Sequence, residues 1–411
     1  MMRLLKLAAR NLTRNLRRSL LTGAAIAFGL AMMVLMITLQ EGSYKEMLRS
    51  GISTLAGHVV IEDPEYTKEE EPEYVVHDVA ALSAKLQEAL PTAVIAPRMQ
   101  VGGLLTSPTN SVGIGLRGVR AAAESQVTDF DEKVVEGEWL DDADDRGILI
   151  GVAMADRLGV GLGDKVVFMG QSRGGEVESR LFRVKGLFRT GGAELDSFVG
   201  MTTLGPVQEL NATPDAAHQI TVHLQNPRAA HEAREIARSV TPAGLSVLTW
   251  DEALPDIVAL IKLDRVSADV MMIVIGLIVA MGVLNTVLMS VMERVREFGV
   301  LLGIGMRPGR VATLVLAEGL VLGLISTGVG IVVGLALAWP LVHYGLDYSA
   351  FMGGDTMEME GIVVSAVIKG AYGWGRIAQY SFGAIVFTVL SAIYPAWYIT
   401  RLEPVQAMRN V

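Results

Sequence analysis

Four long apolar runs constrain this chain more than any other feature of its sequence. Each run supplies roughly the 20 residues that a helix needs to cross the ~30 Å hydrocarbon layer of a membrane. A soluble protein would have to bury all four in one very large core, in a chain whose residues are 51% apolar. The sequence therefore predicts an α-helical integral membrane protein with four transmembrane helices, at residues 20–39, 270–292, 311–338 and 380–399.

The positions of Lys and Arg predict how the chain is threaded. Basic residues in short loops stay on the cytoplasmic side of a membrane. Six basic residues and no acidic one precede the first run, and arginines also follow the second and the fourth run. We therefore predict that the N and C termini are both cytoplasmic. The six leading residues are Arg3, Lys6, Arg10, Arg14, Arg17 and Arg18.

The segment between the first and second runs carries the opposite charge. Residues 41–267 contain 35 acidic and 21 basic residues, whereas the net charge of the whole chain is −9. This balance favours a translocated, periplasmic domain and argues against one that binds nucleic acid. Residues 3–19, by contrast, place leucines near helical spacing with cations between them. They predict an amphipathic helix on the inner leaflet; a basic flank that only fixes topology is the alternative.

The pattern of the acidic segment predicts a large extracytoplasmic α+β domain. Short β-type runs are punctuated by Gly and Pro, and helical runs lie at 79–90 and 229–240. The predicted domains are 1–43 for the amphipathic helix and first span, 44–266 for the periplasmic domain, and 267–411 for the other spans. The predicted strands are 58–63, 92–97, 111–116, 165–169 and 180–188.

The second span is predicted to begin well outside the membrane. Pro255 suits the first turn of a helix, and no breaker follows it before Met292. A continuous helix over these residues would be ~57 Å long at 1.5 Å per residue. Such a rod would connect the outer domain to the cytoplasmic side, and a break near residues 264–269 is the alternative.

Small and polar residues stand out within the spans. Gly319 and Gly323 are four positions apart, as are Gly330 and Gly334. This spacing lets helix backbones approach closely in lipid, so it predicts helix packing or a dimer contact, with chance in a Gly-rich chain as the alternative.

Two polar residues interrupt the apolar runs. Asn285 lies in the second span and Glu318 about two turns into the third. An ionisable group in a span is a functional candidate, and an ion path is one interpretation of Glu318. We favour a structural role, in which its carboxylate accepts hydrogen bonds from the turn at residues 303–309.

No pattern of catalytic or metal-binding residues is present in the sequence. Residues 159–165 read GVGLGDK, which lacks the Gly-Lys-hydroxyl end of a phosphate-binding loop. The six histidines form no HExxH pair, no GxSxG elbow occurs, and the chain contains no cysteine. The sequence therefore predicts no catalytic residue, no metal and no cofactor, and any ATP would be bound by a partner subunit.

The segment ERVREFGVLLGIGMRPG, residues 293–309, is charged and then apolar, and it lies between two spans. This pattern is typical of an element that couples a membrane protein to a separate motor protein. The layout of one span, a large outer domain and three further spans resembles the MacB/FtsX-type ABC transporter permeases, especially their lipoprotein-releasing LolC/LolE branch. The resemblance is carried by LAARNLTRNLRRSLLTGAAIAFG, by MERVREFGVLLGIGMRPGRVATLVLAEGLVLGLISTGVG and by YPAWYITRLEPVQAMR, with further matches in the outer domain such as GILIGVAMADRLGVGLGDKV.

The resemblance implies a multi-pass protein of the bacterial inner membrane with several partners. It implies a cytoplasmic ABC ATPase dimer, a second permease copy or paralogue, membrane lipids, and a lipoprotein or a periplasmic carrier or adaptor. The substrate-binding residues stay unknown. The residues implied to couple to the ATPase are Glu293, Arg294, Arg296, Glu297, Phe298, Gly299, Leu302, Gly303 and Gly305.

Three functions remain open on the sequence. The first is a permease that converts cytoplasmic ATP hydrolysis into periplasmic work by mechanotransmission and releases lipoproteins. The second is a MacB-like efflux permease for peptides or drugs, and the third is an FtsX-like regulator of a periplasmic hydrolase that transports nothing. One feature departs from the LolC pattern, because the loop at residues 170–179, which would catch a lipoprotein carrier, is short.

Overall fold

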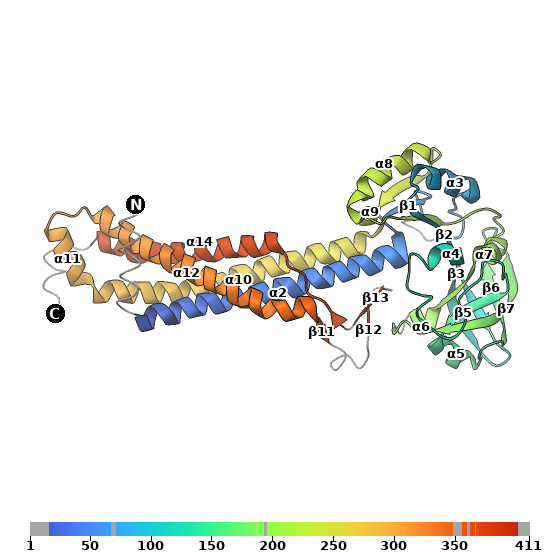
Figure 1. The fold of residues 1–411 in the computed structure, drawn as a ribbon, viewed down its shortest axis with the longest axis horizontal. Helices are drawn as coiled ribbons and strands as arrows, with labels where there is room; N and C mark the ends of the chain where they lie inside the picture. Colours follow the sequence, from blue (N-terminus) through green and yellow to red (C-terminus); the bar gives the residue numbers. More distant parts are fainter. Residues whose placement is uncertain are drawn as a thin grey trace. The chain divides into compact units, whose positions relative to one another are not determined.

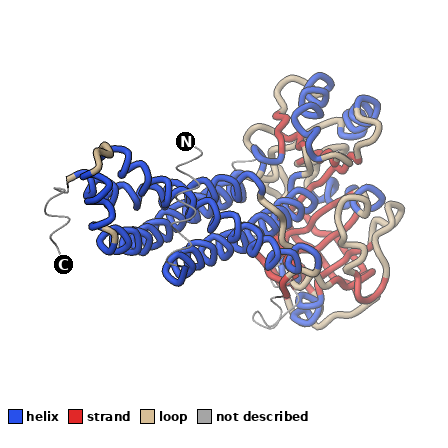
Figure 2. The backbone as a smooth tube through the Cα atoms, turned by 60° about the vertical axis from the view of Figure 1, so that its left-hand side comes forward, coloured by secondary structure: helices blue, strands red, loops and turns tan. Residues whose placement is uncertain are grey.

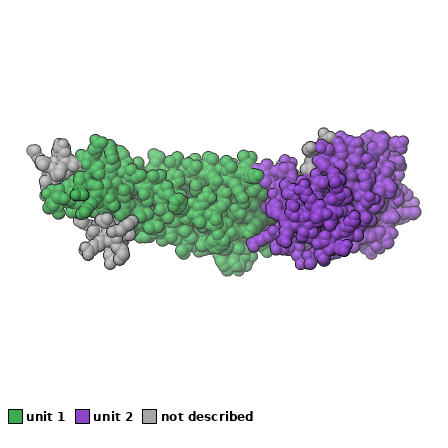
Figure 3. Space-filling model, turned by 90° about the horizontal axis from the view of Figure 1, so that it is seen from above, with its two compact units in different colours: residues 1–45, 261–346, 368–411 green, residues 46–260, 347–367 purple. Residues whose placement is uncertain are grey.

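The computed structural model describes residues 16–66, 71–192, 195–347, 356–359, 362–365 and 367–401 (Figure 1). The long helices run side by side, and most strands gather in a separate part of the chain (Figure 2). The chain forms two compact units (Figure 3), one of residues 1–45, 261–346 and 368–411 and the other of residues 46–260 and 347–367. Most of the predicted amphipathic helix lies outside the described residues.

Four long helices build the first unit, and all four are long and apolar enough to cross a membrane. They are α2 (Leu16–Gly51), α10 (Pro255–Glu293), α12 (Pro308–His343) and α14 (Trp374–Thr400). The prediction of four spans is confirmed. Helix α10 runs through 39 residues without interruption, so the predicted rod is confirmed and the alternative break near residues 264–269 does not occur.

The glycine pairs of α12 are packing positions within one chain. A Cβ atom added at Gly330 would lie 2.8 Å from the carbonyl oxygen of Ala27 in α2, and one at Gly334 would lie 2.7 Å from the Cβ of Val34. Gly319 and Gly323 face α14 in the same way, with Ala392 and Thr388 as the nearest neighbours. These faces are therefore covered by helices of the same protomer and are not open to a second copy.

The second unit contains two lobes that share one long strand, β2 (Val94–Thr106). In the first lobe the strand order is β10-β1-β9-β2, with β10 at Ser246–Thr249, β1 at Val59–Glu62 and β9 at Gln219–His223. Helices α3 (Val79–Ala89) and α8 (Ala230–Val240) contribute Leu82, Leu86, Ala233 and Ala237 to its core. Both helices confirm the predicted runs.

The second lobe is a closed ring of six strands. The pairing runs from β2 through β3, β8, β5 and β7 to β6, and β6 pairs with β2 again. Large side chains from several strands, including Leu105, Leu116, Phe168 and Phe182, are fully buried in its core. The bounds are β3 Ser111–Val119, β5 Gly147–Gly151, β6 Lys165–Gln171, β7 Val177–Phe188 and β8 Val199–Thr203, with β4 (Val134–Gly137) at the edge of β7.

All five strands predicted from the sequence occur, and β2 is much longer than predicted. Short elements complete the unit: α4 (Ala121–Glu124), α5 (Val152–Leu158), α6 (Leu195–Phe198), α7 (Leu204–Leu210) and η2 (Pro227–Ala229). The chain between α12 and α14 contains β11 (Leu346–Asp347), β12 (Thr356–Met359), β13 (Ile362–Ser365) and β14 (Val367–Ile368).

The first two spanning helices lead into neighbouring strands. Helix α2 continues through a π-helical turn, η1 (Ile52–Ala56), into β1, and β10 leads through α9 (Trp250–Ala253) into α10. Strands β1 and β10 pair antiparallel, with Val59 opposite Thr249. A capping box between Thr249 and Glu252 starts α9. The ends of α2 and α10 are thus connected through one short β-ladder.

Candidate functional site

A short helix, α11 (Val295–Gly303), lies between α10 and α12, at the end of the bundle where α2 begins and α14 ends (Figure 1). Its inner face is fixed by packing, because Phe298 is only 1% exposed and contacts the apolar cluster of Val291, Val311, Val315, Ala396 and Ile399. Gly305 follows with φ +93°, a conformation that suits glycine, and Pro308 occupies the first turn of α12. The sequence thus folds this segment into a helix with one buried face.

Arg294 joins α11 to α12 through an ion pair. Its Nη1 donates to both carboxylate oxygens of Glu318, at 3.0 and 3.3 Å, and its Nε donates to Glu297 at 3.1 Å. The side chains of Arg294 and Glu318 are 16% and 14% exposed. Glu318 therefore has a structural partner in Arg294, whereas the sequence suggested the turn at residues 303–309.

The outer face of α11 is exposed and mixes charge with apolar surface. Arg296, Val300 and Ile304 follow one another at four-residue intervals, and Val300 and Ile304 are 48% and 75% exposed. We call these three residues the α11 face. Sequence reasoning selected Arg296 and missed the two apolar residues, although the four-residue spacing within the segment could have identified them. Of the other expected coupling residues, Glu293, Gly303 and Gly305 are exposed, Gly299 is buried, and Leu302 packs against the cluster around Phe298.

A cavity of about 650 Å³ lies between α2 and α10 in the first unit, and we call it the α2/α10 cavity. Its walls are mostly apolar and rich in methionine, a flexible side chain that adapts to irregular ligands. Gln40, Asp264 and Ser267 line its polar end. The methionines are Met32, Met33, Met36, Met271 and Met272.

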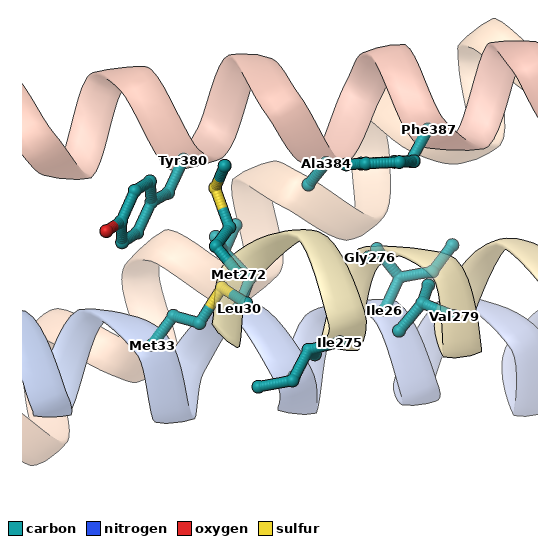
Figure 4. A pocket seen from close by; sticks show the side chains of 11 residues that line it. Ile26, Leu30, Met33, Met272, Ile275, Gly276, Val279, Tyr380, Ala384 and Phe387 are labelled. Carbon is teal, nitrogen blue, oxygen red and sulfur yellow. The ribbon is translucent and has the colours of Figure 1, made fainter. Parts of the chain in front are cut away.

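A narrower cavity of about 30 Å³ adjoins the α2/α10 cavity and shares Met33, Met272 and Tyr380 with it. Figure 4 shows side chains of α2, α10 and α14 turned toward this space. The aromatic ring of Phe387 comes so close to Gly276 that an added Cβ atom would lie 2.6 Å from it. Asn285, which the sequence singled out together with Glu318, is exposed on α10 and lines neither cavity.

Polar side chains join α2, α10 and α14 near the polar end of the α2/α10 cavity. Asp264 accepts hydrogen bonds from Tyr44 and from Gln40, the latter at 3.3 Å. Asp269 accepts from Arg376 at 2.9 Å and from Tyr380 at 2.8 Å. Arg265 and Glu41 add an ion pair at 3.4 Å. Asp264 and Asp269, which bound the alternative break in α10, therefore bind this helix to its neighbours.

Two histidines of the second unit, His218 and His223, are buried. Burial lowers the pKa of His218 to about 4. Burial, with Arg98 and His58 nearby, lowers the pKa of His223 to about 2. Across the described ranges, no group of three or more His, Asp or Glu side chains could hold a metal ion.

Two family descriptions match the chain. The MacB-like periplasmic core domain matches residues 19–240, and the FtsX-like permease C-terminal region matches residues 270–404. The two matches together include all four spans and most of the outer domain.

Known relatives align with nearly the whole chain. The lipoprotein-releasing system transmembrane protein LolC of Xylella fastidiosa (strain 9a5c) is 24% identical over 396 residues, covering 93% of this chain and 92% of the relative. The lipoprotein-releasing system transmembrane protein LolE of Haemophilus influenzae is 20% identical over 396 residues. This alignment covers 94% of this chain and 92% of the relative. The pyoverdine export ATP-binding/permease protein PvdT of Pseudomonas syringae pv. tomato is 24% identical over 96% of this chain but only 58% of the relative.

Proposed function

Because the chain belongs to the family of FtsX-like permeases with a MacB-like periplasmic core domain, we propose that it extrudes acylated proteins from the bacterial inner membrane. It is an ABC transporter permease of the LolC/LolE/MacB type, and such subunits are not catalytic themselves. A separate cytoplasmic ATPase dimer supplies the energy, and a second permease copy or paralogue completes the complex. Both termini and α11 then face the cytoplasm, and the large domain is periplasmic.

The α2/α10 cavity is the observation that carries this proposal. Its volume of about 650 Å³ falls within the range of roughly 300–1,000 Å³ that is usual for ligand pockets. Apolar walls suit acyl chains, and the polar end with Asp264 and Gln40 suits the polar part of an amphiphile. Relatives from lipoprotein-releasing systems match over 92% of their length, which supports this substrate class over that of a fused exporter such as PvdT.

The ATPase docks on the α11 face in this proposal. Arg296 offers an exposed cation and Val300 and Ile304 offer exposed apolar contacts, whereas Arg294 is held inside by Glu318. Movement of α11 reaches the outer domain through α10, which is one unbroken helix. The β6–β7 connection, residues 172–176, is short, so no long loop catches a periplasmic carrier here.

The test is ATP hydrolysis by the reconstituted complex in lipid nanodiscs, with and without a triacylated lipopeptide. We expect the lipopeptide to stimulate hydrolysis. Met271→Trp fills the α2/α10 cavity and should abolish the stimulation, while leaving basal hydrolysis unchanged. Met289→Trp is the matched control, because Met289 is similarly exposed on α10 but lies outside the cavity.

Other outcomes would overturn the proposal. If the lipopeptide stimulated hydrolysis equally in both tryptophan variants, the α2/α10 cavity would not be the site that binds it. Stimulation by unacylated peptides or drugs, with no response to the lipopeptide, would indicate an efflux permease. If none of these compounds changed the rate of ATP hydrolysis but a periplasmic cell-wall hydrolase did, the protein would be a regulator that transports nothing.

A further inference from the structure

Arg98 is a buried cation at the junction of the two lobes of the outer domain. It lies in β2 opposite Gln219 of β9 in the first lobe and opposite Val119 of β3 in the ring. It is thus the residue at which β2 passes from one lobe to the other. Its side chain is 5% exposed, and that of its partner Glu124 in α4 is fully buried.

The guanidinium of Arg98 donates hydrogen bonds to two sets of partners. On one side it makes a bidentate pair with Glu124, with Nε 3.1 Å from Oε2 and Nη2 2.9 Å from Oε1. On the other side Nη2 donates to the carbonyl oxygen of Ser53 at 2.8 Å, and Nη1 donates to that of Thr54 at 2.9 Å. Arg117 also donates to the Thr54 carbonyl, at 3.3 Å. Only the fork of an arginine offers enough donors for both sets of partners.

The two carbonyl groups belong to η1, the π-helical turn that ends the first spanning helix. In this turn the N–H of Gly57 donates to the carbonyl of Ile52 at 2.7 Å. Isolated π turns are rare and occur often at functional positions. Carbonyl groups at a helix end carry partial negative charge, which favours a cation there. Gly57 follows with φ +68°, and an added Cβ atom would lie 3.0 Å from Thr221.

We propose that Arg98 is the positioning residue that fixes the end of the first spanning helix to both lobes of the outer domain. Glu124 holds the guanidinium, and the guanidinium holds the η1 carbonyls, so rotation or translation of α2 is passed to β2 and through it to β9 and β3. This inference rests on the proposed function for its role in transport. In this inference α2 moves the outer domain through the ion pair of Arg98 and Glu124. The connection of the domain to α10 is the β1–β10 ladder.

A purely structural role is the competing explanation, and a double variant separates the two. Replacing a buried ion pair by apolar residues of similar size is often neutral for stability. In Arg98→Met with Glu124→Met, the Thr54 carbonyl keeps Arg117 as a donor. Water can reach the freed Ser53 carbonyl from an adjoining polar cavity of about 400 Å³ that Ser53 and Thr54 line. The variant should therefore fold but lose the fixed attachment of η1 to β2.

The first measurement is the distance between spin labels in the full chain in nanodiscs. Because the chain has no cysteine, Arg49→Cys on α2 and Lys165→Cys on the ring give one labelled pair within the second unit, and both positions are exposed. We expect one narrow distance distribution in the parent and its loss in the double Met variant, with an unchanged melting temperature. The control removes the surface pair Arg180 and Glu209 by the same change to Met, and should keep the narrow distribution.

A narrow distribution in the double Met variant would overturn the inference. If that variant does not fold, the same distance is measured in Arg98→Lys, which keeps the charge but loses the forked guanidinium. A broadened distance distribution in Arg98→Lys would support the attachment of η1 by Arg98, and an unchanged distribution would refute it. In the complex, lipopeptide stimulation of hydrolysis should be lost in the variant while basal hydrolysis stays, and full stimulation would also refute it. The label measurement needs no ATPase, so a parent complex without stimulation would refute the proposed function and leave this inference standing.

Discussion

Arg294 and Arg296 are two positions apart and have different surroundings. The resemblance to the permease family implied an ATPase contact for both. In the structure Arg294 bonds to Glu318 and Glu297, and Arg296 is exposed. A substitution at Arg294 therefore changes the position of α11 itself, whereas one at Arg296 changes only its surface.

Charge reversal at these arginines should separate the two effects. Removing one partner of a fully buried ion pair costs about 3–5 kcal/mol. The pair of Arg294 with Glu318 is partly buried, so Arg294→Glu should cost less than that but still lower the melting temperature and release the ATPase. The exchange Arg294→Glu with Glu318→Arg restores opposite charges and should recover much of both. Arg296→Glu should weaken ATPase copurification at an unchanged melting temperature.

The measurements are thermal unfolding in detergent and copurification of the tagged chain with its ATPase. Failure of the exchanged pair to recover any stability over Arg294→Glu would contradict the assigned ion pair. Unchanged copurification of Arg296→Glu would contradict docking on the α11 face.

The sequence located the spanning helices but not their packing, which depends on small residues at defined positions. Hydropathy identified all four spans because it is a sum over about 20 neighbouring residues and does not depend on partners. It could not give the rotation of each helix, and rotation decides what every side chain contacts. Gln40 and Asp264 are 224 positions apart, and no local pattern connects them, so the polar end of the α2/α10 cavity and the partner of Glu318 were beyond prediction.

Two glycines of α12 test this packing directly. Gly330→Ala places a methyl group 2.8 Å from the α2 backbone, whereas Gly328→Ala meets no atom within 4 Å. Both changes gain about 1 kcal/mol of helix propensity, but overpacking costs roughly 1–3 kcal/mol. We therefore expect Gly330→Ala to lower the melting temperature and Gly328→Ala to raise it. Equal shifts in the two variants would contradict the close approach of α12 to α2.

The whole molecule combines an apolar cavity, an exposed α11 face and an outer domain that is continuous with two spanning helices. The sequence predicted the division into spans and outer domain, since charge and periodicity change abruptly near residues 41 and 267. It could not predict the closed ring or the role of Arg98, because these depend on pairings such as that of β2 with β6 and on contacts across 26, 44 and 45 positions. In this account, movement is therefore transmitted by tertiary contacts between segments that are far apart in the sequence.

The most direct test of the central claim is photo-crosslinking from inside the α2/α10 cavity. A benzophenone amino acid replaces Met271 in the full chain, native membranes are irradiated, and the crosslinked partners are identified by mass spectrometry. The account predicts an acylated protein attached at position 271 and none at the control position 289. Equal labelling at both positions, or lipids and unacylated proteins alone at position 271, would contradict it.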